Sequence, residues 1–92
     1  MTQNTRHLVI VGKVQGVGFR YAMGRKAREL AVTGWVRNRA DGSVEAVVQG
    51  SLEAIARIVA WARHGPPHSN VDRVEVEPDE GTFDTFETRP TE

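Results

Sequence analysis

The chain has 92 residues with twelve basic and twelve acidic side chains, so its formal charge at pH 7 is zero. This length suits one small domain with a single core, and the balanced charge excludes the broad basic surface of a non-specific nucleic-acid binder. The absence of cysteine excludes disulfides, zinc fingers, iron–sulfur clusters and thiol nucleophiles. The polar start MTQNTRH leads directly into a predicted strand, so we expect a cytoplasmic protein with neither signal peptide nor membrane span.

The first third of the chain predicts a strand followed by a helix. Residues 7–14 are rich in β-branched side chains and stop at Gln15-Gly16, which indicates a strand that ends in a turn. Residues 19–32 have helical spacing, and we expect Thr33-Gly34 to end the helix. Three apolar side chains share one face of this helix: Met23, Ala27 and Leu30.

The middle of the chain predicts a hairpin and a second helix. Residues 35–39 and 43–49 have strand character, and the turn signal Asp41-Gly42 between them favours a hairpin. Ser51 is suited to cap the N-terminus of a helix that runs to about Arg63 and stops at the sequence Gly-Pro-Pro.

The last part of the chain predicts one clear strand and one short strand. Residues 71–77 alternate charged and apolar side chains, and residues 83–88 have a weaker strand signal. The resulting order is strand, helix, strand, strand, helix, strand, with no repeat or linker. Such a split βαβ arrangement gives an antiparallel sheet with both helices on one face, so we expect residues 1–92 to form one domain.

The segment VQGVGFR at residues 14–20 combines three devices that bind anions. Its two glycines allow backbone N–H groups to converge, and the helix that follows contributes the positive end of its dipole. Arg20 adds a charged fork of donors. Because the dipole at a helix start repels a cation by about 0.3–1 kcal/mol, an arginine at this place indicates that an anion lies between it and the backbone.

Asn38 is the second candidate of the site. It lies two residues after Val36 on the predicted strand, so the two side chains share a side of the sheet, near the glycine loop. Its uncharged amide offers an acceptor and two donors, which suits a water molecule held against a bound anion.

Other kinds of catalytic site lack their residues in this chain. No Walker lysine follows the glycines, no carboxylate pair accompanies the loop, and no serine has a neighbouring histidine pattern. The histidines lack the spacing of metal ligands, so we expect no metal site: His7, His64 and His68. An anion site without metal, base or nucleophile suits a reaction whose leaving group is already good.

Three segments carry the clearest motifs of the chain: GKVQGVGFR at residues 12–20, GWVRN at residues 34–38 and DGSVE at residues 41–45. Together they closely resemble the acylphosphatase family. The resemblance extends over nearly the whole chain. It implies an α+β ferredoxin-like βαββαβ sandwich with a four- to five-stranded antiparallel sheet and two helices on one face. It also implies a hydrolase that cleaves acyl phosphates, the mixed anhydrides of a carboxylic acid and phosphate, without metal or cofactor.

The resemblance also implies the roles of the site residues. In the family an arginine and the loop amides hold the phosphoryl group, and an asparagine orients the attacking water; these roles fall on Arg20 and Asn38. The backbone N–H groups expected to form the cradle are those of Gln15, Gly16, Val17, Gly18 and Phe19. The expected partner is a small acyl phosphate, with inorganic phosphate as product and competitive inhibitor. We expect a monomer that binds neither nucleic acid nor membrane.

Two other functions fit the same order of elements. An RNA-binding module of this plan stacks bases on aromatic residues of its central strands, but residues 7–14 and 43–49 contain no Phe, Tyr or Trp. A sensor of small anions, or an acylphosphatase-like domain of a larger maturation protein, is the second alternative. The sequence departs from the family at its end, where Pro90 predicts a short last strand at a sheet edge.

Overall fold

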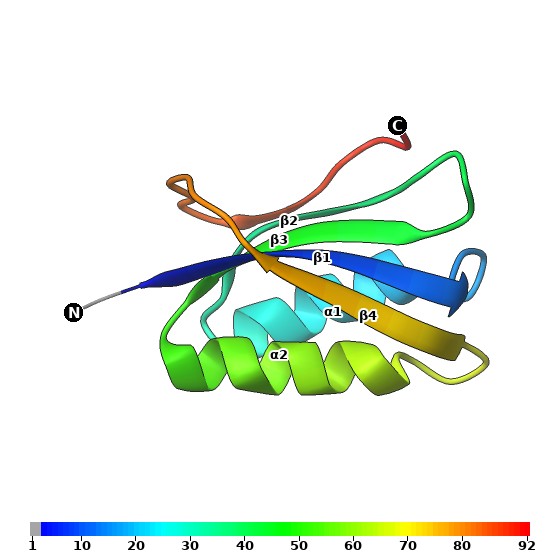
Figure 1. Ribbon diagram of the computed structural model, residues 1–92, viewed down its shortest axis with the longest axis horizontal. Coiled ribbons are helices and arrows are strands. Elements are labelled where there is room, and N and C mark those ends of the chain that lie inside the picture. Colours follow the sequence, from blue (N-terminus) through cyan, green and yellow to red (C-terminus); the bar gives the residue numbers. More distant parts are fainter. Residues whose placement is uncertain (1–2) are drawn as a thin grey trace.

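The computed structural model describes residues 3–92 and contains two helices and five strands (Figure 1). The elements in chain order are β1 (Asn4–Lys13), α1 (Phe19–Glu29), β2 (Thr33–Asn38), β3 (Val44–Gly50), α2 (Leu52–His64), β4 (Asn70–Pro78) and β5 (Phe86–Thr88). The predicted α+β ferredoxin-like order is therefore confirmed, and the short last strand expected over residues 83–88 is β5, which is limited to Phe86–Thr88. Neither helix is long and apolar enough to cross a membrane.

The five strands form one sheet in the order β4-β1-β3-β2-β5. The first four strands pair antiparallel, whereas β5 pairs parallel with β2, with Gly34 opposite Phe86. The expectation of an entirely antiparallel sheet was thus wrong at this edge. The chain crosses from β4 at one edge to β5 at the other and returns in the direction opposite to β4, which is the direction of β2. β5 lies at an edge of the sheet and has three residues. Both features agree with the prediction from Pro90, which has no backbone N–H to donate to a neighbouring strand.

Both helices cover the same face of the sheet, and the core fills the space between them (Figure 1). Alternation in the strands produces this core: Val44, Ala46 and Val48 of β3 are all fully buried. The helices contribute stripes at helical spacing. Their buried core residues are Phe19, Met23, Ala27, Ala54, Ile55, Ile58 and Ala62.

The first helix ends earlier than its apolar pattern predicts. It stops at Glu29, and Ala31 takes the left-handed conformation with a φ of 58°. The N–H of Val32 then donates to the carbonyl of Ala27 at 2.8 Å, which closes the helix end in the manner of a Schellman motif. Thr33-Gly34, which we expected to stop the helix, instead begins β2.

The second helix has the ends that its sequence predicts. The Oγ of Ser51 accepts a hydrogen bond from the N–H of Ala54 at 3.1 Å and so caps the first turn. Gly65 follows the last turn with a φ of 68°, a conformation that glycine adopts without a steric penalty. These ends fix the length of α2 along the sheet.

Candidate active site

The loop between β1 and α1 and the turn between β2 and β3 lie at the same end of the molecule (Figure 1). A cavity of about 210 Å³, here called the loop cavity, opens between them. It is lined by Val14, Gln15, Gly16, Gly18, Phe19, Arg20, Tyr21 and Asn38. Two segments that are separate in the sequence are therefore brought to one site, as their positions on β2 and before α1 predict.

Two left-handed glycines shape the loop. Gly16 has a φ of 76° and Gly18 a φ of 77°. These values favour glycine, because the Cβ atom of any other residue comes too close to a backbone carbonyl oxygen in this conformation. Gly18 precedes α1, and its carbonyl accepts the first helical hydrogen bond, from the N–H of Ala22 at 3.0 Å. The helix α1 therefore begins directly after the loop, with no intervening residue.

The backbone N–H groups of the loop are available to a ligand. Within residues 3–92, the N–H groups of residues 15–18 donate to no backbone or side-chain acceptor. The N–H groups at the start of α1 add further donors, because the first turn of a helix leaves its donors without an intrahelical partner. Such a group of donors at a positive helix end attracts an anion.

Val17 is the one residue of the predicted cradle that does not line the loop cavity. Its half-buried side chain packs against the core beneath the loop. The side chain of Val17 thereby anchors the loop between the two glycines.

Within residues 3–92, the positive charge of Arg20 has no acidic side chain paired with it. In the part of the chain that the structure describes, its guanidinium forms neither an ion pair nor a hydrogen bond with the protein. Arg37, in contrast, pairs with Glu45 at 2.7 Å. The half-buried charge of Arg20 is thus left to act on whatever enters the loop cavity.

Asn38 is the last residue of β2, and its backbone contacts β3 on one side and the C-terminal segment on the other. It pairs with Val44 of β3, and its carbonyl accepts a hydrogen bond from the N–H of Glu92 at 3.1 Å. Val36 on the same side of the strand is fully buried in the core, which confirms that Asn38 faces the helix side. Among residues 3–92, no hydrogen bond uses the Asn38 side-chain amide, so this group remains available in the cavity.

The side chain of Gln15 joins the two halves of the site. Its Nε2 donates to the carbonyl of Arg39 at 2.8 Å and to that of Ser43 at 2.9 Å. These carbonyls flank the turn that follows Asn38. Sequence reasoning assigned Gln15 a backbone role alone, because its partners lie 24 and 28 residues further along the chain and leave no local pattern.

Asp41 stiffens the same turn. Its Oδ1 accepts hydrogen bonds from the hydroxyl of Ser43 at 2.6 Å and from the N–H of Ser43 at 2.9 Å. The hydroxyl bond first, and then the N–H bond, hold the pKa of the Asp41 carboxyl below its usual value. Asp41 is exposed and remains an anion at neutral pH, outside the lining of the loop cavity.

The structure also locates the other ionisable groups. Across residues 3–92, no three His, Asp or Glu side chains gather as metal ligands. His7 lies on the outer face of the sheet, where its Nε2 donates to Glu45 Oε2 at 2.6 Å. The polar side chains that line the loop cavity are therefore one guanidinium (Arg20), two amides (Gln15 and Asn38) and the phenol of Tyr21.

Comparison with known proteins agrees with this geometry. The sequence model of one protein family, described as acylphosphatase, matches residues 6–88. The chain belongs to the acylphosphatase family. Its match to the family includes both the loop before α1 and the β2–β3 hairpin, so the two halves of the site lie within the matched region.

Individual relatives show the same relationship. An acylphosphatase of Thiobacillus denitrificans is 59% identical over 85 residues, which cover 92% of this chain and 96% of that protein. The structure of an acylphosphatase from Coxiella burnetii has a TM-score of 0.91 and 38% identity, and the match covers 95% of this chain and 93% of that one. Membership of the acylphosphatase family makes the chain an enzyme, a hydrolase of acyl phosphates.

The fold also occurs as part of a longer protein. Full-length HypF, solved in a phosphate- and nucleotide-bound form, matches 98% of this chain with a TM-score of 0.89 and 27% identity. The match covers 12% of the HypF chain. The acylphosphatase fold is thus found both at the length of this chain and within a larger polypeptide.

Proposed function

We propose that the loop cavity holds the phosphoryl group of an acyl phosphate while a water molecule positioned by Asn38 attacks the phosphorus. The carboxylate leaves, and inorganic phosphate is the second product. One observation carries this proposal: the Arg20 guanidinium and the Asn38 amide, which have no partner among residues 3–92, line the same small cavity as the glycine loop. A cation, a set of N–H donors and a neutral amide then surround one anionic group.

The backbone of the loop supplies the cradle in this mechanism. The N–H groups donate to the phosphoryl oxygens, and Arg20 adds two parallel charged hydrogen bonds, which suit the planar guanidinium. Because the protein fixes these donors before the substrate binds, they stabilise developing charge without reorganising. The cradle N–H groups are those of Gln15, Gly16, Val17, Gly18 and Phe19.

The reaction needs no further catalytic group. Phosphoryl transfer depends on positioning and on stabilisation of charge, and a carboxylate departs without being protonated. Asn38 fixes the water through its amide and takes no proton. We therefore propose catalysis without metal or cofactor, which agrees with the residues that line the cavity.

The proposed mechanism bears on the domain organisation, the cellular location and the partners of the protein. We propose that residues 1–92 are a single domain, and that the protein acts as a cytoplasmic monomer on a small-molecule substrate. The zero net charge gives no support to nucleic-acid or membrane binding. Inorganic phosphate has the shape and charge of the transferred group, so it competes with the substrate for the loop cavity.

Two substitutions test the site directly. Hydrolysis of benzoyl phosphate is measured with EDTA present for the wild type, Arg20→Gln and Asn38→Ala, together with inhibition by inorganic phosphate. We expect Arg20→Gln to lower kcat/KM by about 10²–10³-fold and to weaken phosphate inhibition, since it removes a preorganised charged donor. Asn38→Ala is expected to lower kcat chiefly, because the water is needed in the transition state and not for binding.

Arg57→Gln serves as the matched control, because Arg57 is an exposed arginine on α2 that pairs with Glu53. It is expected to keep wild-type kinetics. Wild-type turnover in Arg20→Gln would remove the loop cavity from the mechanism. Phosphate binding without any turnover in the wild type would instead favour the sensor, and rapid cleavage of p-nitrophenyl phosphate would indicate a general phosphatase.

A further inference from the structure

Tyr21 is a large aromatic residue that the fold leaves in solvent. Its side chain is 71% exposed although it follows Arg20 directly in the first turn of α1. It nevertheless lines the loop cavity together with Arg20 and Asn38. The ring therefore lies at the mouth of the site and does not contribute to the core.

The other apolar side chains of the cavity are not available to a ligand in this way. Val14 and Phe19 are 1% and 2% exposed and belong to the core. Phe19 also packs edge-on against Trp61, with ring centroids 5.3 Å apart. Tyr21 is thus the apolar surface that the cavity presents to solvent.

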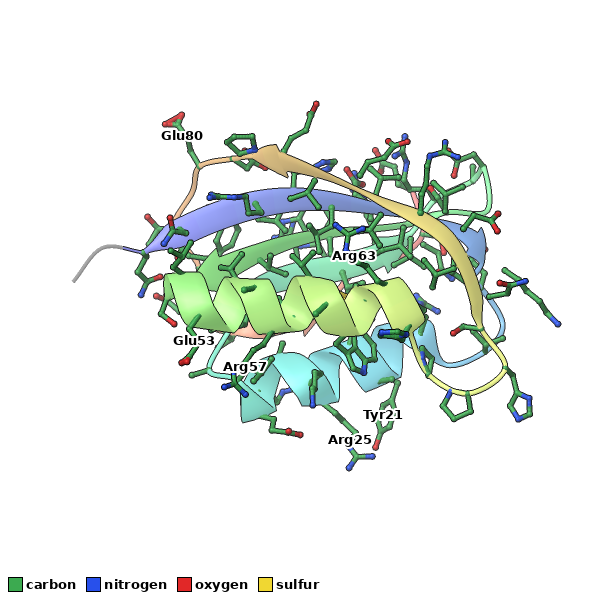
Figure 2. The ribbon with its side chains drawn as sticks, turned by 60° about the horizontal axis from the view of Figure 1, so that its bottom comes forward. Tyr21, Arg25, Glu53, Arg57, Arg63 and Glu80 are labelled. Atoms are coloured by element: carbon green, nitrogen blue, oxygen red, sulfur yellow. The ribbon has the colours of Figure 1, made fainter. Side chains whose placement is uncertain are left out.

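Arg25 accompanies Tyr21 along the helix. Figure 2 shows both side chains projecting from α1 on the same side, away from the sheet. The Arg25 guanidinium lies 6.0 Å from the centre of the Tyr21 ring, at the outer limit of a cation–π contact. Arg25 lies four positions after Tyr21, which places it one turn beyond the mouth of the cavity.

The two ends of an acyl phosphate need different surroundings. In the proposed function, on which this inference rests, the phosphoryl group lies among Arg20, Asn38 and the loop N–H groups. An acyl group that is bound to this phosphoryl group and directed toward solvent extends through the mouth of the loop cavity. There it meets the exposed ring of Tyr21.

We propose that Tyr21 is the specificity-determining residue of the site and contacts the acyl group of the substrate. The ring favours acyl phosphates that carry a flat or extended apolar group next to the carboxyl, such as an aromatic acyl group, over those that carry a methyl group. A ring-to-ring contact removes apolar surface from water and adds the edge or offset attraction of aromatic pairs. A methyl group is too small to make this contact.

The experiment compares two substrates across four proteins. Values of kcat/KM are measured for benzoyl phosphate and acetyl phosphate with the wild type, Tyr21→Ala, Tyr21→Phe and Leu52→Ala. Comparing the ratio of the two values between each variant and the wild type cancels the intrinsic reactivity of each substrate. Leu52→Ala is the control, since Leu52 is 65% exposed at the far end of α2 and lines no part of the loop cavity.

We expect the benzoyl-to-acetyl ratio to fall about 3- to 10-fold in Tyr21→Ala, the size of one aromatic contact. Tyr21→Phe keeps the ring and is expected to keep the ratio within about twofold of the wild type, as is Leu52→Ala. An unchanged ratio in Tyr21→Ala would overturn the proposal. So would an equal fall in Tyr21→Phe, because the hydroxyl and not the ring would then act.

Arg20→Gln separates this proposal from the function on which it rests. If the loop cavity holds the phosphoryl group, that variant loses activity toward both substrates by the same factor and retains the wild-type ratio. Full activity in Arg20→Gln would refute the proposed function itself. A large loss there, combined with an unchanged ratio in Tyr21→Ala, would refute only the role of Tyr21.

Discussion

Gln15 shows how one side chain positions two parts of an active site. Its amide nitrogen reaches the carbonyls on both arms of the β2–β3 turn, at 2.8 Å and 2.9 Å. Both carbonyls have a second partner, because Arg39 O accepts from Gly42 N–H and Ser43 O accepts from Arg39 N–H. The turn therefore forms without Gln15, and the glutamine sets its distance from the loop.

Replacing this amide is expected to affect turnover more than binding. In Gln15→Leu the loop and Arg20 keep their own geometry, whereas Asn38 is no longer tied to them. We expect kcat to fall about 10-fold, since small displacements of reacting groups are costly in rate. Stability falls by about 1–3 kcal/mol for two lost hydrogen bonds.

The measurement is steady-state kinetics with inorganic phosphate as inhibitor, alongside urea unfolding. The inhibition constant of phosphate is expected to stay within about threefold of the wild-type value. Gln3→Leu makes the same chemical change at an exposed residue and serves as the control. A parallel loss of phosphate binding and turnover would show that Gln15 shapes the cradle itself.

At the scale of elements, β2 depends on the C-terminal segment that follows β5. The N–H of Arg89 donates to Val36 O at 2.8 Å, the N–H of Glu92 donates to Asn38 O, and the N–H of Ala40 donates to Glu92 O at 3.0 Å. Residues 89–92 thus make backbone hydrogen bonds beyond the end of β5, as far as the site residue Asn38. This contact places the end of the chain next to the active site.

Deletion of residues 89–92 is expected to loosen Asn38. Loss of three backbone hydrogen bonds lowers the free energy of unfolding by about 2–4 kcal/mol, and kcat falls about 10-fold because the water is less well positioned. Activity and thermal unfolding of the truncated protein are measured together. Glu92→Gln keeps every backbone bond and is expected to retain wild-type kcat; a drop in kcat of similar size in that variant would refute the backbone explanation.

At the scale of the whole molecule, charged side chains tie three strands together on the open face of the sheet. Glu45 of β3 accepts hydrogen bonds from His7 of β1 at 2.6 Å and from Arg37 of β2 at 2.7 Å. Trp35 lies under two guanidinium groups, those of Arg37 at 4.9 Å and Arg89 at 4.8 Å from the ring centre. This face is held by ion pairs and stacking, whereas the helices hold the other.

The Glu45 network makes stability depend on pH. Burial by itself raises the pKa of the Glu45 carboxyl, but the hydrogen bonds from His7 and Arg37 together with their charges outweigh it, so the pKa lies below its usual value of 4.5. A carboxyl whose pKa is lower in the folded state than in the unfolded state stabilises the fold at pH values above its unfolded-state pKa. That contribution is lost as pH falls from 4.5 through the folded pKa.

Urea unfolding between pH 7 and pH 3 measures this effect. We expect Glu45→Gln to be less stable than the wild type at pH 7, and the difference to shrink as the pH falls below about 4.5. Glu53→Gln, which removes an exposed carboxylate of α2 near Arg57, is expected to show little difference at either pH. A difference for Glu45→Gln that stays constant with pH would contradict the ionic explanation.

Most of the fold follows from local pattern. Alternating apolar residues place Val44, Ala46 and Val48 in the core, and the cap at Ser51 and the glycine at position 65 give the ends of α2. The end of α1 was mispredicted because apolar spacing continues to Leu30, whereas the helix stops at Glu29 and Ala31 takes the left-handed conformation. The parallel pairing of β5 depends on which edge of the sheet the chain reaches after β4, a choice that no local pattern contains.

The sequence by itself determined the family, the order of the elements and the two residues, Arg20 and Asn38, on which the proposed chemistry depends. These follow from short segments, because a glycine loop, a helix start and a strand ending in asparagine are local features. The tertiary structure alone decided that the Gln15 amide bridges the loop to the hairpin and that the chain end braces Asn38. Those contacts join residues far apart in the chain, and only packing brings them together.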